Sequence, residues 1–188
     1  LAGALRHCHT LDAICKPYCK SRISDEEVLW TLRLGAFQLF YLSNIPAHAA
    51  VHATIQSARP FLRDRTGFAN AVLRSLQRKG KLEPEFCEEP ARKRLSIGRR
   101  SWMFDKAIFS DEEKFAVDAW SERLSFPRPL VSKWFKDEGE EKAIRRMKAL
   151  NELPPVWLRV NLLRATKEQV RAALEEEGVA VTDHEHPR

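Results

Sequence analysis

The sequence predicts a mainly α-helical chain, in which a helical bundle is followed by an incomplete β-α-β segment. Apolar residues recur every three or four positions through residues 1–80, which is the period of helices that bury one face. Farther on, Val156–Val160 and Val179–Val181 are rich in β-branched and apolar residues, as strands are. Between them, Thr166 and Gly178 are the residue types that begin and end a helix. These three observations define the predicted fold class.

Residues 1–80 are expected to form consecutive helices. The second helix starts at a capping box, in which Ser24 stands three residues before Glu27, and it is apolar on nearly every side. Such a helix is packed on several sides, so it should be the central one. Pro46 suits the first turn of the third helix, which Pro60 should end or kink, and Thr66-Gly67 is expected to be a turn. The residues predicted to share one core are Leu32, Phe40, Phe68, Val72 and Leu73.

The helical pattern loosens after residue 81. An acidic stretch is followed by a basic one that ends at Trp102, and we expect a long, partly irregular connection here. Ser110 and Glu113 form a second candidate capping box, after which short helices follow. Pro154-Pro155 then forces an extended chain. The predicted organisation is a helical domain at 1–81, an extended helical linker region at 82–153 and the start of an α/β subdomain at 154–188.

Charge is distributed unevenly along the 188 residues, whose net charge is +6. Residues 1–80 hold 11 Lys and Arg against 5 Asp and Glu, so the whole excess lies in that half. A basic half hints at a polyanion partner, although a solvated basic face is the plain alternative. No apolar run approaches the roughly 20 residues that span a bilayer, and no signal peptide opens the chain. Four cysteines without a disulfide pattern indicate the cytoplasm, and no membrane association is expected.

Two groups of residues are candidate metal ligands, but neither group forms a complete metal site. His48 and His52 lie one turn apart, a spacing that can hold zinc, but no third ligand accompanies them. Cys8, Cys15 and Cys19 fall on the apolar face of their helix, where cysteine behaves as a small hydrophobe. The sequence also has no phosphate-binding glycine loop and no GxSxG nucleophile motif. We therefore expect no metal, no cofactor and no catalytic residue in this chain.

Three segments in the first half resemble a known domain. They are LGAFQLFYL at Leu34–Leu42, IPAHAAV at Ile45–Val51 and GFANAVLR at Gly67–Arg74. In this order and spacing they are similar to the NusB-like domain of the RsmB/Sun family of ribosomal RNA cytosine-5 methyltransferases. A later segment, PPVWLRVN at Pro154–Asn161, followed by the helix from Thr166, resembles that family's linker and the opening of its pre-catalytic, ferredoxin- or RRM-like subdomain. NusB itself would lack the later segment.

The resemblance implies the N-terminal part of an S-adenosylmethionine-dependent methyltransferase. The first two helices of the family's bundle would be missing, and the chain would stop before the cofactor-binding fold and both catalytic cysteine motifs. None of the four cysteines occupies those motifs, so this chain alone is expected to be inactive. In the full enzyme, as the resemblance implies, a cysteine thiolate adds to the cytosine ring and carbon 5 takes the methyl group.

The partner that the resemblance implies is ribosomal RNA. An enzyme that acts on one base must unstack it, and a separate basic module fixes the register of the RNA through phosphate and shape contacts. Arg159 alternates with apolar Leu158 and Val160 in a predicted strand and should therefore point away from their face. The residues expected to bind RNA are Arg6, Arg33, Arg74, Arg78, Lys79, Arg159 and Asn161.

Two other functions stay open at this stage. A NusB-type transcription antitermination factor would bind RNA without methylating it, although the segment from Pro154 argues against this function. A helical protein-interaction domain would have no nucleic-acid role, and its behaviour would not depend on salt. If the first helices of the bundle are missing, exposed helix faces also leave self-association open.

Overall fold

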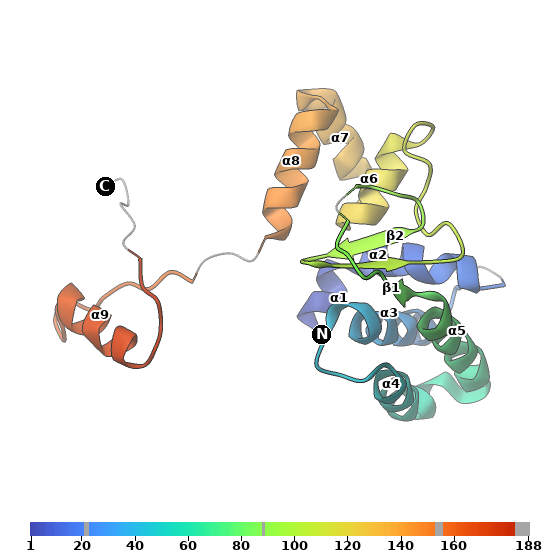
Figure 1. Cartoon of the computed structure of the whole chain (residues 1–188), viewed down its shortest axis with the longest axis horizontal. Helices are drawn as coiled ribbons and strands as arrows, with labels where there is room; N and C mark the ends of the chain where they lie inside the picture. The colour runs from blue at the N-terminus through green and yellow to red at the C-terminus, as the bar shows by residue number, and fades with distance from the viewer. Residues whose placement is uncertain (21–22, 88, 153–155, 183–188) are drawn as a thin grey trace. The chain divides into compact units, whose positions relative to one another are not determined.

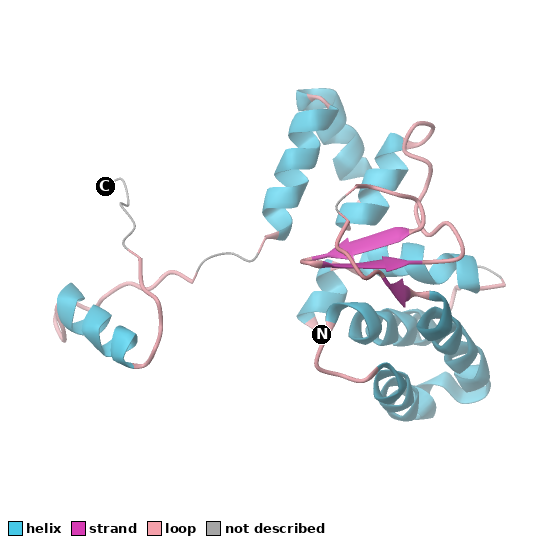
Figure 2. Cartoon of the chain, viewed as in Figure 1, coloured by secondary structure: helices cyan, strands magenta, loops and turns pink. Residues whose placement is uncertain are grey.

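The computed structural model describes residues 1–20, 23–87, 89–152 and 156–182. The chain divides into two compact units, Leu1–Asn151 and Glu152–Arg188. Helices dominate the first unit, and a small sheet accompanies them (Figure 2). Pro154-Pro155, where we predicted an extended junction, lie outside the described residues.

Helices cover most of the described residues up to 79, as the apolar spacing predicted. The short 3₁₀ turns Lys16–Tyr18 and Arg63–Arg65 also belong to this part. The helices are α1 (Ala2–Arg6), α2 (Cys8–Cys15), α3 (Glu26–Tyr41), α4 (Ala47–Leu62) and α5 (Thr66–Lys79). No strand occurs among the described residues up to 80, which confirms the mainly helical fold class for this part of the chain.

Helix α3 is the central helix of the bundle. It packs against α1, α2, α4 and α5, as its nearly continuous apolar surface predicted (Figure 1). The five predicted core residues belong to one hydrophobic cluster. Of these five, only Phe68 is partly exposed. Gly35 permits the close approach of α3 to α5, because a Cβ atom at this position would lie 2.5 Å from Leu73 Cδ1. The predicted core is confirmed.

Two predicted capping boxes are wrong. Asp25, and not Ser24, caps α3, because its carboxylate accepts a backbone N–H of the first turn at 3.2 Å. Both residue types cap helices well, so the sequence pattern could not separate these neighbours. Ser110 opens no helix; its N–H and hydroxyl donate to the Glu122 carboxylate at 2.7 and 3.1 Å. The helix that follows begins at Ala116 instead.

The predicted boundary between the third and fourth helices is also displaced. Pro60 lies in the last turn of α4, and the helix continues to Leu62. Thr66-Gly67, expected to be a turn, forms the start of α5. The chain leaves the helical conformation at Arg63, whose φ of 50° lies in the left-handed region. A long polar side chain at this φ is uncommon, so the residue type did not predict a chain reversal at this position.

Residues 81–103, predicted to be part of an irregular connection, contain an antiparallel sheet instead. Its strands are β1 (Lys81–Leu82), β2 (Arg94–Ile97) and β3 (Arg100–Met103), in the order β1-β3-β2. Strands β2 and β3 form a hairpin in which Ile97 pairs with Arg100. Gly98 has a φ of 58° at the first position of the two-residue turn, as tight hairpins require. Strands of two and four residues are too short to show a clear alternation, so the prediction missed them.

Aromatic residues join the sheet to the bundle. The Phe40 ring meets Trp102 and Phe104 in edge-to-face contacts, with ring centroids 5.8 and 5.3 Å apart. Gly80 carries the chain from α5 into β1 where little room remains, because a Cβ atom there would lie 2.7 Å from the Phe40 ring. In Figure 1 the sheet lies between α3 and α5 on one side and α6 (Ala116–Leu124) on the other.

Three short helices complete the first unit, as the sequence predicted for this stretch. Helix α6 is followed by α7 (Arg128–Glu138) and α8 (Glu140–Asn151). They share a small core formed by Trp120, Val131 and Met147. Helix α2 holds this group to the bundle, since the His9 N–H donates to Ser125 Oγ at 3.0 Å and the Thr10 hydroxyl donates to the Arg123 carbonyl at 3.3 Å.

The second unit contains α9 (Lys167–Glu176). Its capping box is confirmed: Thr166 Oγ1 accepts the Gln169 N–H at 3.3 Å, and the Gln169 side chain accepts the Thr166 N–H at 2.8 Å. The two flanking strands are not formed, because Val156–Val160 and the described residues after Gly178 are extended or irregular. A strand needs a neighbour to pair its backbone groups, and no described residue of this unit supplies one.

Candidate RNA-binding surface

The basic end of α5 is fixed by the packing of its opposite face. Arg78 and Lys79 stand in the last turn, where positive charge interacts favourably with the carbonyl end of a helix. The Gly80 N–H donates to the Leu76 carbonyl at 2.8 Å and closes this turn. The buried residues that anchor the helix are Ala69, Val72, Leu73 and Leu76.

The three predicted RNA-binding cations of α5 differ in what they already contact. Arg74 is half-buried, and its guanidinium donates to Gln77 Oε1 at 3.1 Å. Lys79 pairs with Asp105 at 3.1 Å while half of its side chain remains exposed. Arg78 is exposed and forms no ion pair with any described residue. Arg78 is therefore the cation of α5 most available to a partner.

Asp105 connects the end of α5 to the turn after α2. The Tyr18 hydroxyl donates to Asp105 Oδ1 at 2.6 Å, and this bond, together with the Lys79 ammonium, lowers the pKa of the Asp105 carboxyl. Burial raises the pKa of the Tyr18 hydroxyl, which therefore remains a donor. Lys106 lies over the Tyr18 ring, with Nζ 5.1 Å from the centroid, and donates to the Pro17 carbonyl at 2.7 Å. Lys106 thus adds a cation beside Lys79 that the sequence analysis missed.

Arg33 has a structural partner. Its Nε and Nη2 donate to the two carboxylate oxygens of Asp12, both at 2.7 Å, and this bidentate pair raises the pKa of Arg33. The guanidinium also lies 4.5 Å from the centroid of the Trp30 ring, and the side chain is 13% exposed. Of the residues predicted to bind RNA, Arg33 has the charge that is most fully occupied within the protein.

The remaining predicted RNA-binding residues are Arg6, Arg159 and Asn161. None of them has a described contact with α5. Arg6 is exposed in the last turn of α1. Arg159 and Asn161 belong to the second unit, where both are exposed and where Asn161 Oδ1 accepts the Leu163 N–H at 3.1 Å. Because Val156–Val160 is not a strand in the structure, the predicted alternation that would aim Arg159 outward is not present.

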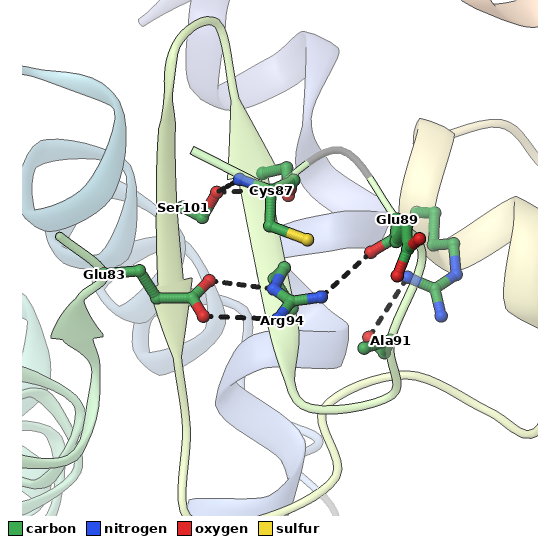
Figure 3. Close-up of polar contacts among 8 residues, drawn as sticks. Glu83, Cys87, Glu89, Ala91, Arg94 and Ser101 are labelled. Carbon is green, nitrogen blue, oxygen red and sulfur yellow. Dashed lines mark hydrogen bonds and ion pairs between the residues drawn. The ribbon is translucent and has the colours of Figure 1, made fainter. Parts of the chain in front are cut away.

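A second basic group lies on the hairpin, which sequence reasoning assigned to an irregular segment. The Arg94 guanidinium donates two hydrogen bonds to the Glu83 carboxylate, at 2.8 and 3.2 Å, and a third to the Glu89 carbonyl at 3.2 Å (Figure 3). Arg100 lies 4.9 Å from the centroid of the Trp102 ring. Gly98 was the sequence signal that could have located this hairpin, because two-residue turns favour glycine.

The described residues show neither a metal centre nor a membrane-spanning helix. No group of three or more His, Cys, Asp or Glu among them is placed to hold a metal ion, and both His48 and His52 are exposed. No described helix is long and apolar enough to cross a bilayer. Cys15 is buried, and burial raises the pKa of its thiol, whereas Cys8 and Cys19 are half-buried.

Comparison with known proteins finds similarity in both parts of the chain. The sequence pattern of the NusB family matches residues 1–78, and the pattern described as "Methyltr_RsmF/B-like, ferredoxin-like domain" matches residues 126–188. The probable ribosomal RNA small subunit methyltransferase B of Bacillus subtilis is 28% identical over 95% of this chain. The chain is homologous to this group of methyltransferases. Those of Vibrio cholerae and Cronobacter sakazakii are 25% and 32% identical over 97% and 85% of the chain.

The chain spans about a third of the length of these methyltransferases B, with 35%, 36% and 29% of the three relatives covered. No solved structure matches it significantly. The NusB match ends in the last turn of α5, and the ferredoxin-like match begins just before α7. The sheet, Asp105 and α6 lie between the two matched regions.

Proposed function

We propose that this chain is the RNA-binding N-terminal part of an S-adenosylmethionine-dependent ribosomal RNA (cytosine-5) methyltransferase. In this role it positions ribosomal RNA for a catalytic domain that the chain itself does not contain. The order of the two matches carries the proposal, since a NusB-family domain precedes the ferredoxin-like domain of RsmF/B-like methyltransferases. A NusB-type antitermination factor would need only the first domain, and a helical protein-interaction domain would need neither.

The methyl donor supplies the methyl group in such enzymes, and no group of residues in the described part of the chain fits its site. The described sheet is antiparallel, and neither the cavity between α3 and α4 nor the cavity beside β2 lies at a glycine-rich turn between a parallel strand and a helix. We therefore assign this chain a binding and positioning role and expect it to transfer no methyl group alone.

Phosphate contacts from the basic end of α5 would supply much of the affinity. Arg78 is exposed and can contact a phosphate directly. Arg74 is hydrogen-bonded to a neutral amide, and half of the Lys79 side chain is exposed. Arg6 can add a further contact, whereas the charge of Arg33 is already paired. In the second unit, Arg159 and Asn161 are exposed and stand within the ferredoxin-like match, next to where a catalytic domain would follow.

A salt series tests this proposal. The logarithm of RNA affinity should fall with the logarithm of salt concentration, with a slope of about −0.7 for each phosphate contacted in a single strand. Replacing Arg74, Arg78 and Lys79 together by alanine should flatten the slope by about two units on a small-subunit ribosomal RNA fragment. The matched control replaces three exposed lysines of α7 and α8, Lys133, Lys136 and Lys142, by alanine. Equal flattening in both triple variants would contradict a specific role for α5.

Arg159 should act on selectivity more than on affinity. Because it lies in the part that precedes the catalytic domain, we expect Arg159→Ala to reduce the preference for the cognate fragment over a scrambled RNA while overall affinity changes little. The measurement is the ratio of the two dissociation constants at one salt concentration. A uniform loss of affinity for both RNAs would instead make Arg159 a plain phosphate contact. If the unaltered chain retains no RNA at low salt, the protein-interaction alternative is favoured.

A further inference from the structure

A second binding site is suggested by a cavity between β2 and α6, whose lining residues other than Lys148 lie in the region that neither family pattern matches. Its volume is about 230 Å³. Leu95, Phe109 and Trp120 form buried walls, with 3%, 4% and 7% of their surface exposed. We call this cavity the hairpin pocket; the residues that give it its chemistry are Phe86, Arg94, Phe109, Trp120, Arg123 and Lys148.

Two hydrogen-bond donors on the lining residues have no acceptor. Trp120 Nε1 and Arg123 Nε are both buried without a hydrogen-bond partner among the described residues. The nearest carboxylate oxygen to Arg123 Nε belongs to Glu112 and lies 3.9 Å away, beyond hydrogen-bonding distance. Indole and guanidinium nitrogens donate and do not accept. A ligand that completes this site must therefore bring acceptor atoms.

Aromatic and guanidinium planes shape the hairpin pocket for a flat ligand. Arg123 lies over the Phe109 ring, with its guanidinium carbon 4.6 Å from the centroid. Arg94 is fixed by both oxygens of Glu83 and by the Glu89 carbonyl, as Figure 3 shows, so its planar face is pre-organised. Unstacked nucleobases bind in this way, between aromatic rings and arginine planes.

The charge around the hairpin pocket distinguishes a base from a free phosphate. Arg94, Arg123 and Lys148 are positive, but Glu83 pairs with Arg94, Glu112 lies near Arg123, and Glu89 lines the pocket itself. Three carboxylates thus offset three cations. A neutral ring with acceptor atoms suits this balance better than a dianion does. Nucleobases are neutral and carry ring-nitrogen and carbonyl acceptors.

We propose that the hairpin pocket binds one unstacked base of single-stranded RNA, an inference that rests on the RNA-binding function proposed above. The base stacks on Phe86, and Trp120 Nε1 and Arg123 Nε donate to its acceptors. Lys148, exposed at the edge of the pocket, pairs with the adjoining phosphate. This contact adds base recognition to the phosphate contacts of α5.

The test uses the full chain and a fluorescently labelled single-stranded RNA hexamer. Phe86→Ala should weaken binding by about tenfold, as the loss of one stacked base does. Phe115→Ala is the matched control, because Phe115 is also an exposed phenylalanine but does not line the pocket. Trp120→Phe keeps the aromatic ring, removes the Nε1 donor and should also weaken binding. Fluorescence anisotropy gives the dissociation constants, and circular dichroism checks that each variant is folded.

Two further measurements separate base binding from phosphate binding. The salt slope should be the same for Phe86→Ala and the unaltered chain, because stacking releases no counterions, whereas the α5 triple variant flattens it. An abasic hexamer should bind the unaltered chain and Phe86→Ala equally. If Phe86→Ala still weakens binding of the abasic strand, the pocket holds phosphate and the inference is wrong.

The two proposals fail in different ways. If the unaltered chain binds the hexamer while Phe86→Ala and Trp120→Phe bind as tightly as Phe115→Ala does, the hairpin pocket holds no base and the RNA-binding function stands. If the unaltered chain binds neither the hexamer nor the ribosomal RNA fragment at low salt, the proposed function itself falls, and the pocket inference falls with it.

Discussion

At the scale of single residues, local partners decide which basic side chains are available to RNA. Arg33 and Arg78 look alike in the sequence, since both stand on helices in the basic half of the chain. The structure shows that they differ. Arg33 donates two hydrogen bonds to the carboxylate of Asp12, whereas Arg78 is exposed. The 11 lysines and arginines of residues 1–80 therefore overstate the number of cations that RNA can contact.

Asp12→Asn should destabilise the protein without weakening RNA binding. The change leaves the guanidinium of Arg33, 13% exposed, without its charged acceptor, and we expect a loss of about 2 kcal/mol in the free energy of unfolding. Asp64→Asn, in the exposed turn before α5, is the control for the change of charge. Urea denaturation measures the loss. If Asp12→Asn lowers RNA affinity more than Asp64→Asn does, Arg33 contributes to RNA binding.

Asp105→Asn should strengthen RNA binding. The lowered pKa of Asp105 keeps its carboxylate charged at neutral and mildly acidic pH, so the pair with Lys79 persists there and is lost only as the pH falls through that lowered value. The amide removes this competitor, so the affinity for the ribosomal RNA fragment at one salt concentration should rise, whereas the salt slope already includes the Lys79 contact and should stay the same. Asp64→Asn makes the same change of net charge elsewhere on the protein. Equal affinities of the two variants for this RNA would show that Lys79 binds no phosphate.

At the scale of elements, the β2–β3 hairpin depends on one glycine. Gly98 has a φ of 58°, and Gly98→Ala should cost about 1–2 kcal/mol because a Cβ atom crowds the backbone in this region. Gly67→Ala is the matched control, since Gly67 is helical with no atom within 4 Å of the added Cβ. That change should stabilise α5 by up to about 1 kcal/mol. The unfolding free energies of the two variants should thus move in opposite directions.

The helices were predictable from the sequence, and the sheet was not. A helix of fourteen or sixteen residues repeats its apolar spacing several times, so α3, α4 and α5 could be located from the pattern alone. Strands β1 and β2 hold two and four residues, too few for alternation to emerge. In the second unit, Val156–Val160 has a strand-like composition, but strand formation depends on a neighbour that the local sequence does not encode.

The sequence predicted the cations of the candidate RNA-binding surface but not the contacts that they make in the fold. Sequence reasoning located Arg74, Arg78 and Lys79 on the polar side of the fourth helix or beyond its end, and the structure places all three in α5, with Arg78 and Lys79 in the last turn. It could not find Asp105 or Lys106, because their contacts with Tyr18 span 87 or more positions of sequence. The hairpin pocket was equally hidden, since its lining residues come from separated segments that pack together only in the fold.

At the scale of the whole molecule, the two units differ in how they are stabilised. Both hydrophobic clusters consist only of residues before 152. Helix α9 has no buried residue, and apolar side chains of the second unit are exposed, including Val156, Leu158, Leu162 and Leu163. Exposed apolar surface of this kind is typical of regions that bind another protein surface. Self-association through exposed helix faces of the bundle, and the boundary at residue 154, stay predictions.

The contrast between the units predicts the behaviour of a chain that ends at residue 152. Because every residue of the two hydrophobic clusters remains, its urea midpoint should equal that of the full chain. Its salt slope on the ribosomal RNA fragment should also be unchanged, since the α5 cations remain. Its preference for the cognate RNA over a scrambled one should fall at least as far as in full-length Arg159→Ala, because Arg159 and Asn161 are both removed. A lower midpoint would mean that the second unit stabilises the first, and an unchanged preference would place all selectivity in residues 1–152.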